Sequence, residues 1–301
     1  MMETLAAAPW RLFDVEVRAL RRLSPTFLRV TFAGPDLDRL ADNGYDQRIK
    51  LVFPRPGSGL EGLPTSVDFY RQWRALPEAT RNPIRTYTVR AARPHRNEVD
   101  IDFVLHGDHG PASRWALRAR PGATLAIFGP NAAYDGDHGG VEFQPPAGAR
   151  SLLLAGDETA TPAIGAILER LPATASGSAF LEVPGTADVL PLAAPPGVTV
   201  SWLVRGRQAR GSELVPAVTA AAQRLRMSTS AAPQDLQDID VDAEDLWEVP
   251  NVRGAAPLYA WLAGEAGVIR TLRRRLVGEQ GIDRRCVAFM GYWRLGRPDR
   301  E

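Results

Sequence analysis

Residues 151–172 read SLLLAGDETATPAIGAILERLP, and the hydrophobic pattern of this segment changes halfway along it. Ser151 to Ala155 is a short continuous apolar run, which is typical of a buried strand. Pro162 suits the first turn of a helix, and Pro172 follows the expected helix end. The apolar residues between them, spaced as on one helix face, are Ile164, Ile167, Leu168 and Leu171. A strand that turns directly into a helix is the unit of a parallel α/β sheet.

The rest of the second half repeats this alternation. Strands are expected over 179–183, 198–204, 258–262 and 287–290, and amphipathic helices over 213–226 and 265–278. Such alternation predicts a doubly wound parallel sheet, an architecture that binds dinucleotides.

The first half has the period of strands instead. Its six mostly alternating segments are 13–17, 28–32, 49–53, 84–90, 99–105 and 124–128, with one helix expected over 111–119. Short strands between Pro- and Gly-rich loops predict a six-stranded antiparallel Greek-key β-barrel. The fold class is therefore β plus α/β.

Two domains follow, residues 1–148 and 149–301, separated by a Gly- and Pro-rich stretch at 131–149. A second irregular stretch, the loop 228–251, is acidic. Its charged residues are Asp235, Asp238, Asp240, Asp242, Glu244, Asp245 and Glu248. We interpret it as a solvated loop, with an acidic docking surface as the alternative.

Composition excludes several classes of function. With 301 residues and a formal net charge of +1, the chain has no charge excess that points to nucleic acid or a membrane as the main partner. Cys286 is the single cysteine, so cysteines cannot form an internal disulfide or a metal cluster. The first residues, MMETLAAAPWRLFDV, lack the features of a signal peptide, and no apolar run reaches membrane-spanning length. We expect a cytoplasmic protein.

The hexapeptide RTYTVR, residues 85–90, is the first candidate site. In a strand, Arg85, Tyr87 and Val89 share one face, while Thr86 and Thr88 lie on the other. A flavin dinucleotide requires a cation for its pyrophosphate, a flat ring to pack against, and short hydrogen-bonding groups. The hexapeptide offers all three, although Tyr and Thr are also ordinary strand residues.

The segment HGDHGPAS, residues 106–113, leads into the expected helix. Backbone N–H groups at a helix start form an anion site, to which Ser113 adds a hydroxyl group. His106 and His109 could instead bind a metal, but no third ligand lies nearby on a rigid element. We expect no metal site.

Two strand-to-helix turns in the second half, AGDETATP at 155–162 and WLAGEAG at 261–267, lie where a doubly wound sheet binds nucleotides. Neither is a G-x-G-x-x-G fingerprint. The C-terminal segment MGYWR, residues 290–294, could cover a flavin or pack between domains.

Together these motifs resemble the siderophore-interacting protein family, FAD-dependent ferric-siderophore reductases of the ferredoxin-reductase superfamily. The resemblance covers nearly the whole chain. It rests on Lys50-Leu51 before Phe53-Pro54, RTYTVR at 85–90, DIDFVLHGDHGPASRWA at 100–116, LLLAGDETATPAIGAILERLP at 152–172, WLVRG at 202–206, YAWLAGEAGVIRTLRRRLV at 259–277 and VAFMGYWRLG at 287–296.

The resemblance implies site residues in three groups. FAD would be held by Arg85, Tyr87, Thr88, Val89, Asp102, Phe103, Val104, His106, Gly110, Pro111, Ala112 and Ser113. The nicotinamide nucleotide would lie against Asp157, Glu158, Thr159, Gly264 and Glu265, with Arg205 or Arg207 meeting the 2′-phosphate of NADPH. The ferric complex would meet Lys50, the one lysine of the chain, together with Tyr292 and Trp293.

The implied reaction is hydride transfer from NADPH or NADH to FAD, followed by electron transfer to a ferric siderophore and release of Fe(II). No catalytic side chain is required beyond the flavin. The alternatives are a general NAD(P)H:flavin reductase or diaphorase, a reductase fed by ferredoxin, and a non-catalytic siderophore-binding protein. Nothing in the sequence demands a dimer, so we expect a monomer.

Overall fold

The computed structural model describes residues 7–66, 68–107, 110–146, 148–226, 236, 239, 246–250 and 257–296. The chain divides into two compact units between Val141 and Glu142, against an expected boundary after residue 148. Of the acidic loop 228–251, only Leu236, Ile239 and residues 246–250 are described, and the other residues of that loop lie outside the described part.

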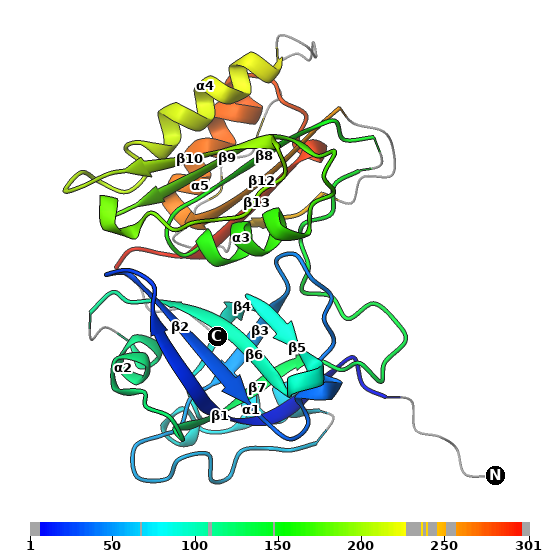
Figure 1. The fold of residues 1–301 in the computed structure, drawn as a ribbon, viewed down its shortest axis with the longest axis vertical. Coiled ribbons are helices and arrows are strands. Elements are labelled where there is room, and N and C mark those ends of the chain that lie inside the picture. Colours follow the sequence, from blue (N-terminus) through cyan, green and yellow to red (C-terminus); the bar gives the residue numbers. More distant parts are fainter. Residues whose placement is uncertain are drawn as a thin grey trace. The chain divides into compact units, whose positions relative to one another are not determined.

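The first unit is built on one curled antiparallel sheet (Figure 1). Its strands are β1 (Trp10–Arg22), β2 (Phe27–Ala33), β3 (Arg48–Val52), β4 (Ile84–Thr88), β5 (Ala91–Arg93), β6 (Glu98–Val104) and β7 (Thr124–Pro130). The spatial order is β4-β3-β7-β1-β2-β6-β5. The edge strands β4 and β5 are separated in the chain by Val89 and Arg90 alone, so the sheet must curl to bring its two edges together.

The expected count of six strands is wrong, because this sheet has seven. The predicted run 84–90 contains the reason. The amide of Val89 still donates to the carbonyl of Gln47, beside β3, whereas the amide of Arg90 donates to Asp100 on β6. The chain thus changes partner within two residues, and a separate strand, β5, begins. A switch of partner leaves no signal in the hydrophobic period.

Alternation explains the core of this unit. Along β1, Phe13, Val15 and Val17 are buried while Asp14 and Glu16 are exposed. The helices are α1 (Phe69–Ala75) and α2 (Pro111–Arg118), with 3-10 turns at Leu37–Arg39, Glu78–Thr80 and Pro94–Arg96. The sequence predicted α2 but not α1.

The second unit has a six-stranded sheet in the order β10-β9-β8-β12-β13-β11. Its strands are β8 (Ser151–Gly156), β9 (Ser176–Val183), β10 (Gly197–Val204), β11 (Trp247–Glu248), β12 (Leu258–Glu265) and β13 (Val287–Trp293). All pairs are parallel except β11 with β13, so the sheet is mixed rather than wholly parallel. The short strand β11 ends the sheet on one edge.

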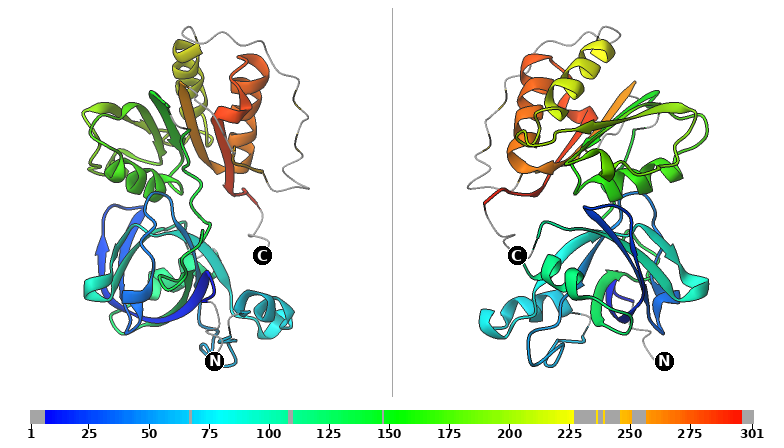
Figure 2. Two further views of the ribbon diagram at one scale, coloured as in Figure 1. Left: turned by 90° about the vertical axis from the view of Figure 1, so that its right-hand side faces the viewer. Right: turned by 60° about the vertical axis from the view of Figure 1, so that its left-hand side comes forward.

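Helices cover both faces of this second sheet. They are α3 (Thr161–Arg170), α4 (Leu214–Arg226) and α5 (Ala266–Arg273), followed by a π-helical turn at Arg274–Glu279 and 3-10 turns at Thr186–Asp188 and Arg284–Cys286. Figure 2 shows α3 on one face and α4 with α5 on the other. The order of strands reverses between β8 and β12, and ligands of such sheets bind at that switch point.

None of the helices in the described part of the chain is both long and apolar enough to cross a membrane.

Candidate functional site

Two predicted turns of the second unit meet at the switch point. Asp157 directly follows β8, and its Oδ2 accepts hydrogen bonds from the Glu265 amide (2.8 Å) and from Trp293 Nε1 (2.9 Å). Its Oδ1 accepts a hydrogen bond from the Thr159 amide at 2.8 Å. The structure therefore joins the Asp157–Thr159 turn, the end of β12 and the C-terminal Trp293 through one buried carboxylate.

Gly264 allows this close approach. Its φ is +148°, and a Cβ atom at this position would lie 2.8 Å from Asp157 Oδ2. A side chain would displace the carboxylate and break its hydrogen bonds, so the glycine is a requirement of the turn. Sequence analysis placed Gly264 beside the nicotinamide nucleotide, and the structure identifies Asp157 as its neighbour.

Glu158 points to a different set of partners. It forms a two-bond ion pair with Arg205, at 2.7 and 2.8 Å, and a third contact with Arg210 Nη2 at 3.1 Å. Glu158 is 0% exposed and Arg205 is 6% exposed. Arg210 also lies over the ring of Trp293, with its Cζ 4.7 Å from the ring centroid.

These contacts shift the pKa values of the two neighbouring carboxyl groups in opposite directions. Burial alone would raise the pKa of Glu158, but the hydrogen bonds and charge of Arg205 hold it below its usual value. Burial and the charge of Glu158 raise the pKa of Asp157. Arg205 is thereby committed to Glu158, whereas Arg207, the other arginine predicted for a 2′-phosphate, is exposed.

Two helices of this unit, α4 and α5, begin at carboxylates of the chain itself, and a third carboxylate holds the turn before α3. Asp157 accepts from the Thr159 amide before α3, and Glu265 Oε2 accepts from the Val268 amide of α5 at 2.9 Å. Glu182, at 0% exposure, accepts from three amides at the start of α4, at 2.8, 3.1 and 3.1 Å. All three carboxylates line one narrow cavity. No motif pointed to Glu182, because it lies within the strand β9.

The first unit carries the residues predicted for the flavin. Tyr87 lies opposite Ile49 and Arg85 opposite Leu51, so the two side chains share a face of β4 as expected. The Tyr87 ring lies 4.6 Å from the Phe103 ring. Phe103 in turn lies 5.7 Å from Trp115 of α2, so β4, β6 and α2 share one aromatic cluster.

The start of α2 differs from the starts of α4 and α5. Gly110 is its N-cap residue with φ +82°, and no side chain among the described residues caps it. Ala112 and Ser113 follow in the first turn and are buried, with Pro111 half-buried before them. His106 is exposed, and the neighbours 108 and 109 lie outside the described residues. An amide-rich turn with a half-buried arginine and an aromatic ring on the same unit suits an anionic dinucleotide.

Asp102 has a different environment from the one expected of a group that faces a cofactor. Arg29 donates two hydrogen bonds to its carboxylate, at 2.7 and 2.8 Å, and Arg90 lies 3.7 Å away. Its neighbour Val104 ends β6, paired with Phe27 of β2. The carboxylate of Asp102 therefore joins strands, and its contact with FAD stays a prediction.

Lys50 lies on the opposite face of β3 from Ile49, and its Nζ donates to Thr86 Oγ1 at 2.8 Å. Lys50 lines a cavity of about 440 Å³ together with residues that sequence analysis missed. The aromatic residues among them are Trp10, Tyr70 and Phe128, and the charged one is Arg48. The buried pair Phe69 and Trp73, four residues apart, was the available signal for the helix that carries Tyr70.

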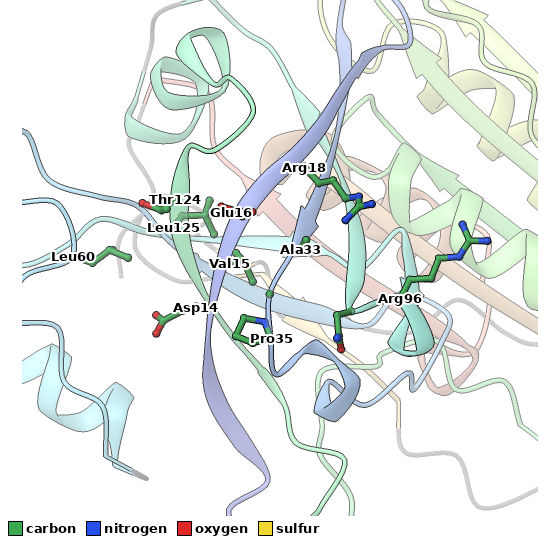
Figure 3. Close-up of a pocket in the computed structure, with 12 residues that line it drawn as sticks. Asp14, Val15, Glu16, Arg18, Ala33, Pro35, Leu60, Arg96, Thr124 and Leu125 are labelled. Carbon is green, nitrogen blue, oxygen red and sulfur yellow. The ribbon is translucent and has the colours of Figure 1, made fainter.

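A larger hollow of about 650 Å³ crosses β1, β2 and β7 (Figure 3). Acidic and basic side chains both line it, among them Asp14, Glu16, Arg18 and Arg96. No predicted site residue belongs to this lining, and its charges do not favour one sign of ligand. We therefore place no function there.

Tyr292 and Trp293 differ in their contacts. Tyr292 stacks on Trp247 of β11, with ring centroids 5.8 Å apart and planes inclined by 16°. Trp293 belongs to the Asp157 cluster. Their predicted contact with the ferric complex stays a prediction.

Known protein families match residues in both units of the chain. The family model described as the siderophore-interacting FAD-binding domain matches residues 16–134, and the model described as siderophore-interacting protein matches residues 149–296. Ferric vibriobactin reductase ViuB of Vibrio cholerae is 33% identical over 275 residues, which cover 91% of this chain and 86% of that protein. The NADPH-dependent ferric-chelate reductase of Escherichia coli is 29% identical, covering 94% and 93%.

Solved structures of siderophore-interacting proteins are similar to this chain over nearly its whole length. A siderophore utilization protein from T. fusca is 30% identical with a TM-score of 0.70, covering 97% of this chain and 96% of that chain. The siderophore-interacting protein SipS from Aeromonas hydrophila is 31% identical with a TM-score of 0.67, covering 96% and 93%. The ferredoxin reductase of a carbazole 1,9a-dioxygenase, 15% identical with a TM-score of 0.60, shares the fold. With two matched segments that together span most of its length, the chain belongs to the siderophore-interacting protein family.

Proposed function

We propose that this protein is a ferric-siderophore reductase, which passes electrons from NADPH or NADH through FAD to a ferric siderophore and releases Fe(II). One observation carries the proposal. The two family-matched segments, 16–134 and 149–296, fall in separate structural units, and each unit has an arrangement suited to one dinucleotide. The relatives ViuB and the ferric-chelate reductase of E. coli carry names that state this type of reaction.

The first unit is the proposed flavin domain, with the Greek-key barrel of this superfamily over about residues 1–148. Arg85 would neutralise the pyrophosphate of FAD, and Tyr87 would pack against its isoalloxazine ring. Thr88 would donate a hydrogen bond from its hydroxyl group. The turn from Gly110 to Ser113 would supply amides for the remaining phosphate oxygens. When bound, FAD supplies a centre that accepts an electron pair as hydride and gives electrons singly to iron.

The proposed nicotinamide domain is residues 149–301, which lie almost wholly in the second unit. Asp157 and Thr159 would border the nucleotide on one side of the switch point, and Gly264 with Glu265 on the other. Glu158 and Arg205 would hold the turn in shape. The position of Arg207 on the exposed loop after β10 supports it, rather than Arg205, as the contact for a 2′-phosphate.

The chain's own contribution to reduction is position and charge. Hard oxygen ligands bind Fe(III) more tightly than the less charged Fe(II), so reduction loosens the complex and spares the chelator. Lys50 supports this step with a cation that attracts an anionic ferric complex. No side chain has to exchange a proton with the substrate.

The test is an absorbance spectrum of the purified protein, followed by anaerobic addition of NADPH, NADH or reduced ferredoxin. A flavin spectrum that bleaches with a nicotinamide and recovers on addition of ferric siderophore, while a ferrous trap colours, is the expected result. Bleaching by ferredoxin alone would favour the ferredoxin-fed alternative. Equal rates with ferricyanide, free flavin and every ferric siderophore would favour a general reductase, and colourless protein that binds ferric siderophore would favour a binding protein.

The proposal further takes the protein as a monomer that acts in the cytoplasm. Sedimentation of the FAD-loaded protein tests the oligomeric state.

A further inference from the structure

The cavity around Lys50 combines aromatic rings with positive charge, and electron transfer to iron does not by itself require the rings. It is formed within the first unit, by the start of β1 and the residues before it, by β3 and β4, by α1, by the end of β7 and by Gly140. Its residues are Ala8, Pro9, Trp10, Arg48, Ile49, Lys50, Tyr70, Thr86, Phe128 and Gly140. Its volume of about 440 Å³ lies within the usual range for small-molecule sites.

Aromatic rings form one wall of this cavity. The ring of Phe128 lies 5.4 Å from that of Trp10 and 6.5 Å from that of Tyr70, with the planes of Phe128 and Tyr70 inclined by only 9°. Tyr70 also stacks on the buried Trp73, at 5.5 Å. Ring pairs at such distances attract one another, and a further ring on the open side gains the same attraction.

Cations accompany these rings. Lys50 Nζ lies 5.9 Å from the centroid of the Tyr70 ring while it donates to Thr86 Oγ1. Arg48 is the second basic residue of the lining. A wall that combines rings and positive charge selects a ligand that is both flat and anionic.

Backbone contacts hold the Trp10 side of the cavity in place. Trp10 Nε1 donates to the His138 carbonyl at 2.6 Å, and the Arg48 amide donates to the Gly140 carbonyl at 2.8 Å. A Cβ atom on Gly140, whose φ is +80°, would lie 3.1 Å from the Trp10 ring. The ring is therefore oriented before any ligand arrives, which lowers the cost of binding.

The position of the Tyr70 ring depends on a helix that is not part of the sheet. It lies on α1, which stands outside the curled sheet between β3 and β4 (Figure 2). Phe69 and Trp73, both buried, attach this helix to the sheet and leave Tyr70 half-buried at the cavity.

We propose that this cavity binds one aryl arm of the ferric siderophore, a catecholate ring, and that Tyr70 and Trp10 select catecholate over hydroxamate complexes. The inference rests on the proposed function and names its substrate class. A ferric tris-catecholate complex carries negative charge and flat rings, which match the cations and the aromatic wall. A ferric tris-hydroxamate complex built on aliphatic chains is neutral and offers neither.

Calorimetry of the full FAD-loaded chain with gallium(III) complexes tests this directly. Gallium(III) does not undergo reduction here, so the measurement reports binding whether or not the protein reduces iron. We expect the tris-catecholate complex to bind the wild-type protein at least about tenfold more tightly than the tris-hydroxamate complex. Tyr70→Ala should weaken catecholate binding by about two- to tenfold, as expected for loss of one ring contact, and leave hydroxamate binding unchanged.

Tyr70→Phe is the matched control, because it keeps the ring and should keep wild-type affinity. Tyr70→Leu removes the ring but keeps apolar bulk, so it should show the same weakened catecholate binding. It serves as the test if Tyr70→Ala folds poorly. Equal affinity for both complexes, or catecholate affinity that is unchanged in both ring-less variants, overturns the inference. Selective gallium binding without any ferric reduction would instead refute the proposed function and leave the cavity assignment standing.

Discussion

Arg205 and Glu158 form a buried ion pair with two hydrogen bonds, Nη1 to Oε2 at 2.7 Å and Nη2 to Oε1 at 2.8 Å. Removal of Arg205 leaves the buried charge of Glu158 with the longer contact to Arg210, at 3.1 Å, in place of the two-bond pair. We expect Arg205→Ala to lower the free energy of unfolding by about 3–5 kcal/mol. Arg207→Ala, at an exposed position two residues further on, should change it by less than about 0.5 kcal/mol. Urea unfolding checks both, and equal stability of the two variants would show that the pair is dispensable.

Gly264→Ala tests the junction of the two turns. The new Cβ would lie 2.8 Å from Asp157 Oδ2, at a φ of +148° that other residues rarely adopt. We expect a loss of about 1–3 kcal/mol in the free energy of unfolding. Gly185→Ala is the control, since its Cβ would meet its nearest atom, Asp188 Oδ2, at 3.7 Å. If both variants unfold at the same urea concentration, the close approach at Gly264 is not required.

Arg85→Ala tests the flavin assignment. Loss of the cation that we assign to the pyrophosphate should lower FAD affinity at least about tenfold, since a hydrogen bond to a charged group contributes roughly 1.5–3 kcal/mol. Arg96→Ala, an exposed arginine of the same unit, should retain the wild-type flavin content. Titration of apoprotein with FAD, followed by flavin fluorescence, gives the two affinities. Wild-type affinity in Arg85→Ala would remove this residue from the site.

Lys50→Ala tests attraction of the ferric complex. The variant should bind FAD normally and reduce anionic ferric complexes several-fold more slowly at low salt. The difference from wild type should shrink as ionic strength rises, because salt screens the charge. Stopped-flow reoxidation of the reduced flavin, measured between about 10 mM and 500 mM salt, checks this. A rate deficit that is independent of salt would assign Lys50 a packing role instead.

Asp100 should make the first unit sensitive to acid. Burial alone would raise its pKa, but hydrogen bonds from Arg93 and Thr31, together with the charges of Arg93 and Arg29, hold it below its usual value. A carboxylate with a lowered pKa stabilises the fold fully above its unfolded pKa of about 3.9, and this contribution is lost as pH falls through the folded-state pKa. Asp100→Asn should therefore be less stable than wild type at pH 6, by about 1–3 kcal/mol, and the gap should narrow toward pH 3.

Urea unfolding at several pH values measures that gap. Asp14→Asn, an exposed carboxylate on β1, should match wild type throughout. A gap between Asp100→Asn and wild type that stays constant from pH 6 to pH 3 would contradict the assignment.

Much of the fold was predictable, because the spacing of hydrophobic residues along the chain indicates which side chains are buried. The continuous apolar run at 151–155 became the central strand β8, and the alternation at 13–17 became part of β1. Features set by long-range partners were not predictable. Strand β5 exists because Arg90 meets Asp100, and β11 exists because Trp247 lies opposite Met290.

The candidate site divides in the same way. Motif residues such as Asp157 and Gly264 stand out locally, and the structure brings them together. The aromatic cavity was missed because its rings come from segments far apart in the chain, with Trp10 at the start of β1 and Tyr70 on an unpredicted helix. The engagement of Arg205 by Glu158, 47 positions away, is equally invisible without the fold.

The carboxylates at the starts of α4 and α5 have a consequence for nucleotide exchange. In many dinucleotide-binding sheets, the ligand's own pyrophosphate satisfies the amides at a helix start. Here Glu182 and Glu265 already accept hydrogen bonds from amides at the starts of α4 and α5, so a pyrophosphate placed at either helix start would meet negative charge in place of open donors. We therefore expect a nicotinamide nucleotide bound at this edge of the sheet to leave soon after it has given up its hydride, because fixed carboxylates repel its phosphates.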